Sequence, residues 1–209
     1  MLTTINKMEI KKENSGKILS ILARGIFQDQ TATILAKELK MSRWGVWKIL
    51  KELEKKGLII LISLGSGKTN THLIRLNWKN DLLEKTLSLI FAQEAAGYGR
   101  WKFAFSELEA YADFLILYGS ILHSPKEAGD IDIISVVSNK KNFLKIDDII
   151  KEKQVTQSKK IHDINFTLKE FKSELQKPNK AFIDAIKKGI VLFGQEKFIK
   201  FIRKIKNDN

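Results

Sequence analysis

The chain has 209 residues, 44% of them hydrophobic and 29% charged, which is ordinary for a folded protein and leaves room for one large domain or two small ones. It contains no Cys, which excludes disulfides and thiolate metal sites and fits the reducing cytoplasm, where we expect the protein to work. Its net charge of +13 is concentrated in residues 1–80, which hold 15 Lys and Arg against 6 Asp and Glu, and this excess favours a polyanionic partner such as DNA.

A lysine-rich composition, with 32 Lys against 5 Arg, is the competing explanation of that charge. No apolar run approaches the ~20 residues that a membrane span needs. The stretch Met1–Ser15 is polar and lacks the apolar core of a signal peptide. The sequence therefore predicts no membrane partner.

Three helices are predicted in the first third of the chain, over Gly16–Arg24, Thr31–Leu39 and Ser42–Lys56. Thr31 and Ser42 are favourable N-cap residues, and Gly57 is expected to end the third helix. Apolar residues recur at helical spacing and are expected to face a core: Ile18, Leu19, Ile21, Leu22, Ile34, Leu35, Leu39, Val46, Ile49, Leu50 and Leu53.

Two strands, Leu58–Leu64 and Thr71–Leu76, are predicted next, joined by a Gly-rich turn. The turn contains "GSGKT", which is similar to the end of a P-loop. Ile62 stands where that motif requires Gly, and the segment joins two strands, whereas a P-loop leads into a helix. We therefore interpret it as a turn whose Lys68 can reach a DNA phosphate.

The order of three helices and a hairpin, together with "MSRWGVWKILKELEKKGLI", resembles a winged helix-turn-helix over residues 14–77. The resemblance implies a DNA-binding domain over residues 1–80, in which the third helix enters the major groove, and a homodimer if the DNA site is palindromic. The residues expected to contact DNA are Ser42, Arg43, Trp44, Trp47, Lys48, Lys51 and Lys68. Packing of Trp44 and Trp47 against the rest of the protein, and a purely protein-binding role, are the alternatives.

A helical connector is predicted over residues 81–112, followed by a domain over residues 113–209 in which strands and helices alternate. The predicted strands are Phe114–Tyr118, Ile131–Val137, Ile161–Thr167 and Ile190–Phe193. The predicted helices are a short one beginning at Ser120, then Asn142–Gln154, Leu168–Leu175, Lys180–Lys188 and a basic amphipathic one, Glu196–Lys206. The whole chain is thus expected to be α+β with a small mixed sheet in its second half.

The strongest chemical signal is "FLILYGSILHSPKEAGDIDIISVV", residues 114–137. Gly119 permits a tight turn and close approach to a phosphate, and Ser120 offers a hydroxyl and an N–H group at the start of a helix. Asp130 and Asp132 alternate along a strand, so both carboxylates project from one face. Two neighbouring carboxylates suit Mg²⁺, which joins protein oxygens to substrate phosphates.

Tyr118-Gly119-Ser120 followed by Asp130-Ile131-Asp132-Ile133 resembles the motif of the polymerase-β-type nucleotidyltransferases, and the size resembles their minimal members. The resemblance covers residues 113–200 and implies transfer of a nucleotidyl group from a nucleoside triphosphate, ATP being the expected one, to an acceptor hydroxyl. It also implies two Mg²⁺ ions and a third carboxylate on a neighbouring strand.

Asp163 is the only acid in the third strand, "IHDINFT", and is expected to supply the third carboxylate. If Asn165 lies in that place, nucleotide would bind without efficient transfer. His123 stands where many relatives carry Arg and is expected to have no specific role. Two hypotheses follow: an enzyme that modifies an acceptor, which includes a partner toxin because some relatives are antitoxins, or a DNA-binding regulator that senses nucleotide.

Overall fold

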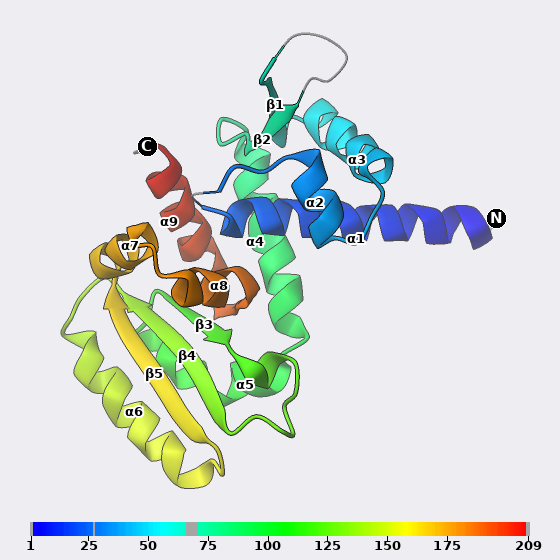
Figure 1. Ribbon diagram of the computed structural model, residues 1–209. Coiled ribbons are helices and arrows are strands. Elements are labelled where there is room, and N and C mark those ends of the chain that lie inside the picture. The colour runs from blue at the N-terminus through cyan, green and yellow to red at the C-terminus, as the bar shows by residue number, and fades with distance from the viewer. Residues whose placement is uncertain (1, 27, 66–70, 208–209) are drawn as a thin grey trace. The chain divides into compact units, whose positions relative to one another are not determined.

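The computed structural model describes the backbone of residues 2–26, 28–65 and 71–207 and is an α+β structure with two small sheets (Figure 1). The chain divides into two compact units, Met1–Ile90 and Phe91–Asn209. The boundary falls inside one helix, α4 (Asp81–Ala96). Among the described residues, no helix combines the length and the apolar character needed to span a membrane.

The first unit contains three helices, an antiparallel hairpin and the beginning of α4. The three helices are α1 (Leu2–Arg24), α2 (Ala32–Glu38) and α3 (Arg43–Lys55), and the hairpin strands are β1 (Ile59–Ser63) and β2 (His72–Leu76). The predicted order of elements is confirmed. The first helix begins at Leu2, well before the predicted Gly16, because the polar residues before Gly16 include several good helix formers.

The predicted helix ends of this unit are confirmed by their backbone geometry. The Thr31 and Ser42 side chains accept hydrogen bonds from the Ile34 and Gly45 N–H groups. Gly57 follows α3 with a φ of +67°, a conformation that costs glycine little. Helix α3 therefore has a fixed start and a fixed end before the chain turns into β1.

The apolar face of α3 is buried as predicted, with Val46, Ile49, Leu50 and Leu53 all in the core. In α2 the prediction is only partly right, since Leu35 is buried but Ile34 is 44% exposed. A helix of only 7 residues presents a narrow inner face, which Leu35 and Ala36 fill.

The second unit is built on a four-stranded mixed sheet with the strand order β5-β4-β3-β6, of which β5, β4 and β3 are labelled in Figure 1. β3 lies antiparallel to both β4 and β6, whereas β4 and β5 are parallel. The strands are β3 (Phe114–Tyr118), β4 (Asp130–Val137), β5 (Lys160–Thr167) and β6 (Ile190–Phe193). The helices are α5 (Gly99–Ala104), α6 (Asn142–Thr156), α7 (Leu168–Gln176), α8 (Lys180–Lys188) and α9 (Gln195–Asn207), with short 3-10 turns η1 (Ser106–Ala110) and η2 (Ser120–Leu122).

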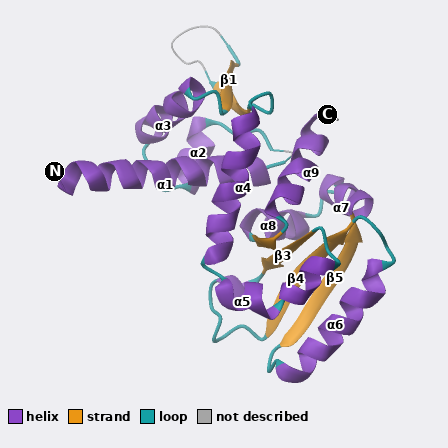
Figure 2. Ribbon diagram, turned by 180° about the vertical axis from the view of Figure 1, so that it is seen from behind, coloured by secondary structure: helices purple, strands orange, loops and turns teal. Residues whose placement is uncertain are grey.

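Helices cover both faces of this sheet, which Figures 1 and 2 show from opposite sides. On one face, Trp101, Leu108 and Ile146 of α5, η1 and α6 share a buried core with Leu115 and Ile133 of β3 and β4. The other face carries α7, α8 and α9, whose aromatic side chains surround Phe114 of β3 and Phe166 of β5. Alternate residues of each strand therefore point into two different environments.

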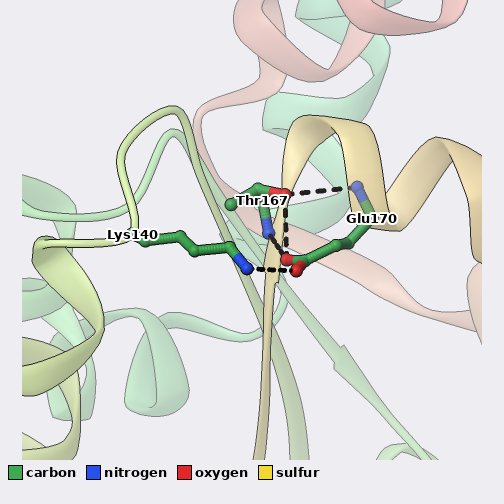
Figure 3. Close-up of polar contacts among 3 residues, drawn as sticks. All are labelled: Lys140, Thr167 and Glu170. Atoms are coloured by element: carbon green, nitrogen blue, oxygen red, sulfur yellow. Dashed lines mark hydrogen bonds and ion pairs between the residues drawn. The ribbon is translucent and has the colours of Figure 1, made fainter.

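The corner between β5 and α7 is fixed by reciprocal hydrogen bonds (Figure 3). Thr167 Oγ1 accepts a hydrogen bond from the Glu170 N–H group at 3.2 Å, and the Glu170 carboxylate accepts one from the Thr167 N–H group at 2.9 Å. Lys140 lies 2.6 Å from the same carboxylate, and its hydrogen bond, with those from Thr167, lowers the pKa of Glu170 to about 2. This capping box sets the direction in which α7 leaves the sheet.

Candidate functional site

The glycine-serine bend lies directly against one of the predicted acids. Gly119, at the end of β3, has a φ of +83°, and a Cβ added there would collide with the Asp132 carboxylate. Both the backbone conformation and the close approach therefore require glycine. Ser120 begins η2, so the short helix predicted there is a single 3-10 turn of 3 residues.

Strand register places three polar side chains in a row across the sheet. Asp132 of β4 is paired with Tyr118 of β3 on one side and with His162 of β5 on the other. Directly paired residues project from the same face of a sheet, and Asp130 shares that face because it lies two residues before Asp132. The face is the one that carries α7, α8 and α9.

Asp130, Asp132 and His162 form a compact set of possible metal ligands. The Nδ1 atom of His162 lies 3.5 Å from Asp130 Oδ2 and 3.4 Å from Asp132 Oδ1. One ligand atom from each residue fits within 4.8 Å of the other two. Two carboxylate oxygens and one imidazole nitrogen make a donor set that suits a divalent cation.

Negative charge is crowded on this face of the sheet. Burial, and then the neighbouring Asp130 carboxylate, raise the pKa of Asp132, while His162 acts to lower it. Burial and the Asp132 carboxylate raise the pKa of Tyr118 to about 12, with smaller contributions from Asp163 and Asp130. A bound cation would relieve this repulsion.

A cavity of about 320 Å³ opens beside the bend. Tyr118, Gly119 and Ser120 form one side of it, and Asp184 and Lys188 of α8 form another. Lys188 has no ion-pair partner among the residues that the structure describes. His123, which the sequence left without a role, also lines this cavity.

The expected third carboxylate is not at this site. Asp163 is paired with Ile133, so its side chain projects from the opposite face, under α6. There its carboxylate accepts a hydrogen bond from Ser135 Oγ at 2.9 Å, and Asn165 donates one to Asp147 of α6 at 3.0 Å. The structure corrects the expectation for both Asp163 and its alternative Asn165. Each lies an odd number of residues after His162, so its side chain projects from the opposite face of the sheet.

Sequence reasoning missed His162, Tyr118 and Lys188. The sequence signal for His162 was its place directly before Asp163 in "IHDINFT". Two polar residues in succession do not show which of them faces Asp130 and Asp132. Only the pairing of Asp132 with His162 decides between them. Nothing in the sequence indicated that Lys188 belongs to this site, because α8 follows the Gly119 bend at a long distance along the chain.

The residues predicted to contact DNA lie on and around α3 in the first unit. The Ser42 side chain caps the helix, Trp44 is 66% exposed, and Lys48 Nζ lies 5.0 Å from the centre of the Trp44 ring. Trp47 packs on His72 of β2, with a ring separation of 5.0 Å, so the two Trp residues behave differently. Lys68 lies outside the described residues.

Arg43 and Lys51 occupy two further positions on α3. Lys51 is 2.6 Å from Glu54 and lies over the Trp47 ring, so part of its charge is already compensated. Arg43 lines a cavity of about 200 Å³ together with Trp47, Thr31 and His72. Within this cavity Arg43 contributes a guanidinium group suited to phosphate.

Two comparisons with known proteins gave no match. Neither a model of a known protein family nor a curated protein sequence matches the chain significantly.

Replacing Gly119 with Ala tests the close contact between the bend and Asp132. We expect a loss of about 1–3 kcal/mol in the free energy of unfolding from backbone strain, measured by urea denaturation. The control is Gly129→Ala, because a Cβ at Gly129 meets open space and its φ is not positive. Equal stabilities for the two variants would contradict the described bend.

Replacing Asp163 with Asn tests the burial of this carboxyl under α6. Burial, with a contribution from Asp147, raises its pKa from 3.8 to about 6 against the lowering effect of the Ser135 hydrogen bond. The folded chain therefore binds the proton more tightly than the unfolded chain, and wild-type stability falls as pH rises between these two values. Relative to the variant, the free energy of unfolding of the wild type should fall by about 3 kcal/mol between about pH 4 and pH 7. Urea denaturation in EDTA measures this difference. A difference that does not change with pH would place Asp163 in solvent.

Proposed function

We propose that this protein is a metal-dependent nucleotidyltransferase with a DNA-binding N-terminal domain. The observation that carries the proposal is the Asp130, Asp132 and His162 set lying against the Gly119 bend. It is supported by the likeness of Gly119-Ser120 and Asp130-Ile131-Asp132 to the polymerase-β-type motif. The expected domain over residues 113–209 belongs to this proposal, as does the winged helix-turn-helix over residues 1–80.

Asp130, Asp132 and His162 would hold the metal ion. Such an ion, when bound, supplies positive charge that neutralises the phosphates of a nucleoside triphosphate. Mg²⁺ prefers oxygen ligands, whereas an imidazole nitrogen favours later divalent ions. We therefore propose that His162 shifts the preference from Mg²⁺, which the sequence alone suggested, toward Mn²⁺, with ATP still the expected nucleotide.

The cavity beside the bend would hold the triphosphate. Ser120 can donate its hydroxyl and its N–H group, and the Lys188 ammonium group on the opposite wall can bind a phosphate oxygen. Gly119 keeps the backbone close to Asp132, so a phosphate in the cavity lies next to the acids. Binding and orientation therefore come from three separate elements, β3, η2 and α8.

An acceptor hydroxyl must lose its proton as it attacks. His162 occupies the place in which the resemblance implied a carboxylate, but an imidazole that binds a cation through one nitrogen carries a hydrogen on the other and cannot accept a further proton. Its 42% exposed side chain is accessible to an acceptor from solvent. We propose that His162 takes the place of Asp163 as a ligand only, and that the proton of the acceptor hydroxyl passes to solvent water.

The DNA-binding part of the proposal rests on α3. The helix has a capped N-terminus, an apolar face buried in the unit, and Arg43, Trp44 and Lys48 on its outer side. Basic side chains near the start of such a helix suit the phosphates and base edges of a major groove. The exposed Trp44, with Lys48 beside it, is available for contact with DNA, whereas Trp47 has a structural role against His72.

A second candidate function is a DNA-binding regulator that senses nucleotide without turnover. The placement of Asp163 on the opposite face favours it, because the site then lacks a third carboxylate. Under this alternative, the wild-type chain transfers no label from any nucleoside triphosphate, yet nucleotide changes its affinity for DNA.

Transfer of label from α-³²P-labelled ATP to an acceptor in cell lysate tests the enzyme proposal. Asp130→Asn and Asp132→Asn should each reduce transfer by at least ~10²-fold, since both remove a metal ligand. The exposed acid Asp148 of α6 provides the control variant Asp148→Asn, which should transfer normally. A folded Asp163→Asn variant that loses transfer as completely as Asp130→Asn would restore Asp163 to the site and refute the role of His162.

His162→Asp offers a direct measure of the proposed ion preference. A set of three carboxylates should shift the metal ion that gives the fastest transfer from Mn²⁺ toward Mg²⁺, because an oxygen ligand replaces the nitrogen ligand. Unchanged activity with both ions would show that His162 does not contact the metal.

Arg43→Ala is expected to weaken binding of the chain to duplex DNA and to reduce the slope of log affinity against log salt by about 1, if Arg43 contacts a phosphate. Lys55→Ala, which removes the same charge from the last turn of α3, is the matched control and should change the slope less. Fluorescence polarisation over a range of salt concentrations measures both quantities. Identical slopes for the two variants would remove Arg43 from the interface.

A further inference from the structure

A second and larger cavity lies in the second unit, away from the candidate metal site. Its volume is about 610 Å³, within the range of small-molecule binding sites. Helices α7 and α9, which lie side by side in Figures 1 and 2, provide most of its walls. The ring centres of Phe171 and Phe201, 5.4 Å apart, join the two helices beneath it.

The cavity is at the opposite end of the strands from the Gly119 bend. It is lined by Asp113, which precedes β3, and by Ser138, which follows β4. The bend follows β3 and Asp130 begins β4, so the length of a strand of 5 residues, roughly 16 Å, separates the two places. A ligand in one cavity would therefore not occupy the other.

The walls of this cavity are strongly basic. Five lysines line it, two from α7 and three from α9: Lys169, Lys172, Lys197, Lys200 and Lys204. Those of α9 lie on one stripe of the helix, because they are three and four residues apart. Like charges held so close repel each other, and an anion in the cavity would relieve that repulsion.

Asp113 is the only acid in the lining, and it is already engaged. It accepts hydrogen bonds from Ser138 and from Lys197, the latter at 2.9 Å. Burial by itself would raise the pKa of Asp113, but these two partners hold it below its usual value. Within the described part of the chain, Lys169, Lys200 and Lys204 have no ion-pair partner. Three positive charges are thus available to a ligand.

The floor of the cavity is apolar. Leu168, Phe201 and Ile205 form it, and Phe201 is held by contacts with Phe114 and Phe171. A small inorganic anion would leave this floor uncovered. The combination of an apolar floor and lysine walls suits a ligand that joins a flat apolar group to phosphates.

We infer that the cavity between α7 and α9 binds a nucleotide unit, with its phosphates on Lys169, Lys200 and Lys204 and its base on the Leu168, Phe201 and Ile205 floor. The unit can come from a free nucleotide or from a single-stranded nucleic acid, which present the same chemistry. This site does not depend on the proposed transferase reaction, because it shares no residue with the metal site.

Binding of ATP by the full chain in EDTA tests the inference by isothermal titration calorimetry. EDTA removes the divalent ions that the Asp130 site needs, and variants of the cavity lysines then show whether the ATP that still binds lies between α7 and α9. Lys200→Glu with Lys204→Glu should weaken binding at least tenfold, since each lost charged hydrogen bond is worth about a factor of ten. The matched control is Lys145→Glu with Lys151→Glu on α6, which changes the net charge equally and should bind like wild type.

A parallel titration with a short single-stranded oligonucleotide identifies the source of the nucleotide unit. Weaker binding of either ligand to the cavity variant than to the control variant supports the site and names its ligand. Equal affinities of the two variants for both ligands would overturn it. Tripolyphosphate bound as tightly as ATP would overturn the role of the apolar floor. Failure of label transfer in Mn²⁺ or Mg²⁺ leaves these outcomes unchanged, so the two proposals fail separately.

Discussion

The register of β4 between its two neighbours is the constraint on which the candidate site depends. Because Asp132 is paired with Tyr118 on one side and His162 on the other, three polar side chains meet on one face of an otherwise apolar sheet. A slip of one residue between β4 and β5 would bring a neighbour of His162 into its place and move His162 to the other face. The hydrogen bond between Ser135 of β4 and Asp163 of β5 opposes such a slip, because the slip would separate its two partners.

The same register crowds negative charge and leaves glycine as the only residue that fits beside it. Gly119 holds the backbone against Asp132, while burial and Asp130 make the Asp132 charge costly. A folded protein keeps such an arrangement when a ligand compensates for it. The crowded acids, the glycine bend and the cavity beside them are therefore the features that support the proposed ligand site.

β5 carries polar groups on both of its faces, and they have different roles. His162 faces the acids and is partly open to solvent, whereas Asp163 is enclosed with Ser135 under α6. The hydrogen bond of this pair joins β4 to β5 at the cost of a buried carboxyl, and the neighbouring Asn165 joins β5 to Asp147 of α6. At the opposite end of β3 and β4, the lysines of α7 and α9 surround an apolar floor. One end of these strands is therefore acidic and the other basic.

The sequence by itself determined most of the elements, because they depend on local patterns: N-caps at Thr31 and Ser42, a glycine at position 57 after α3, and a short apolar run over Phe114–Tyr118. It also determined that Asp130 and Asp132 share a face, since that needs only the two-residue period of one strand. Only the tertiary structure decided that His162 and not Asp163 joins them, because successive strand residues face opposite ways and the choice depends on pairing with another strand. It likewise brought Lys188 to the bend, and α7 beside α9, through contacts between segments distant along the chain.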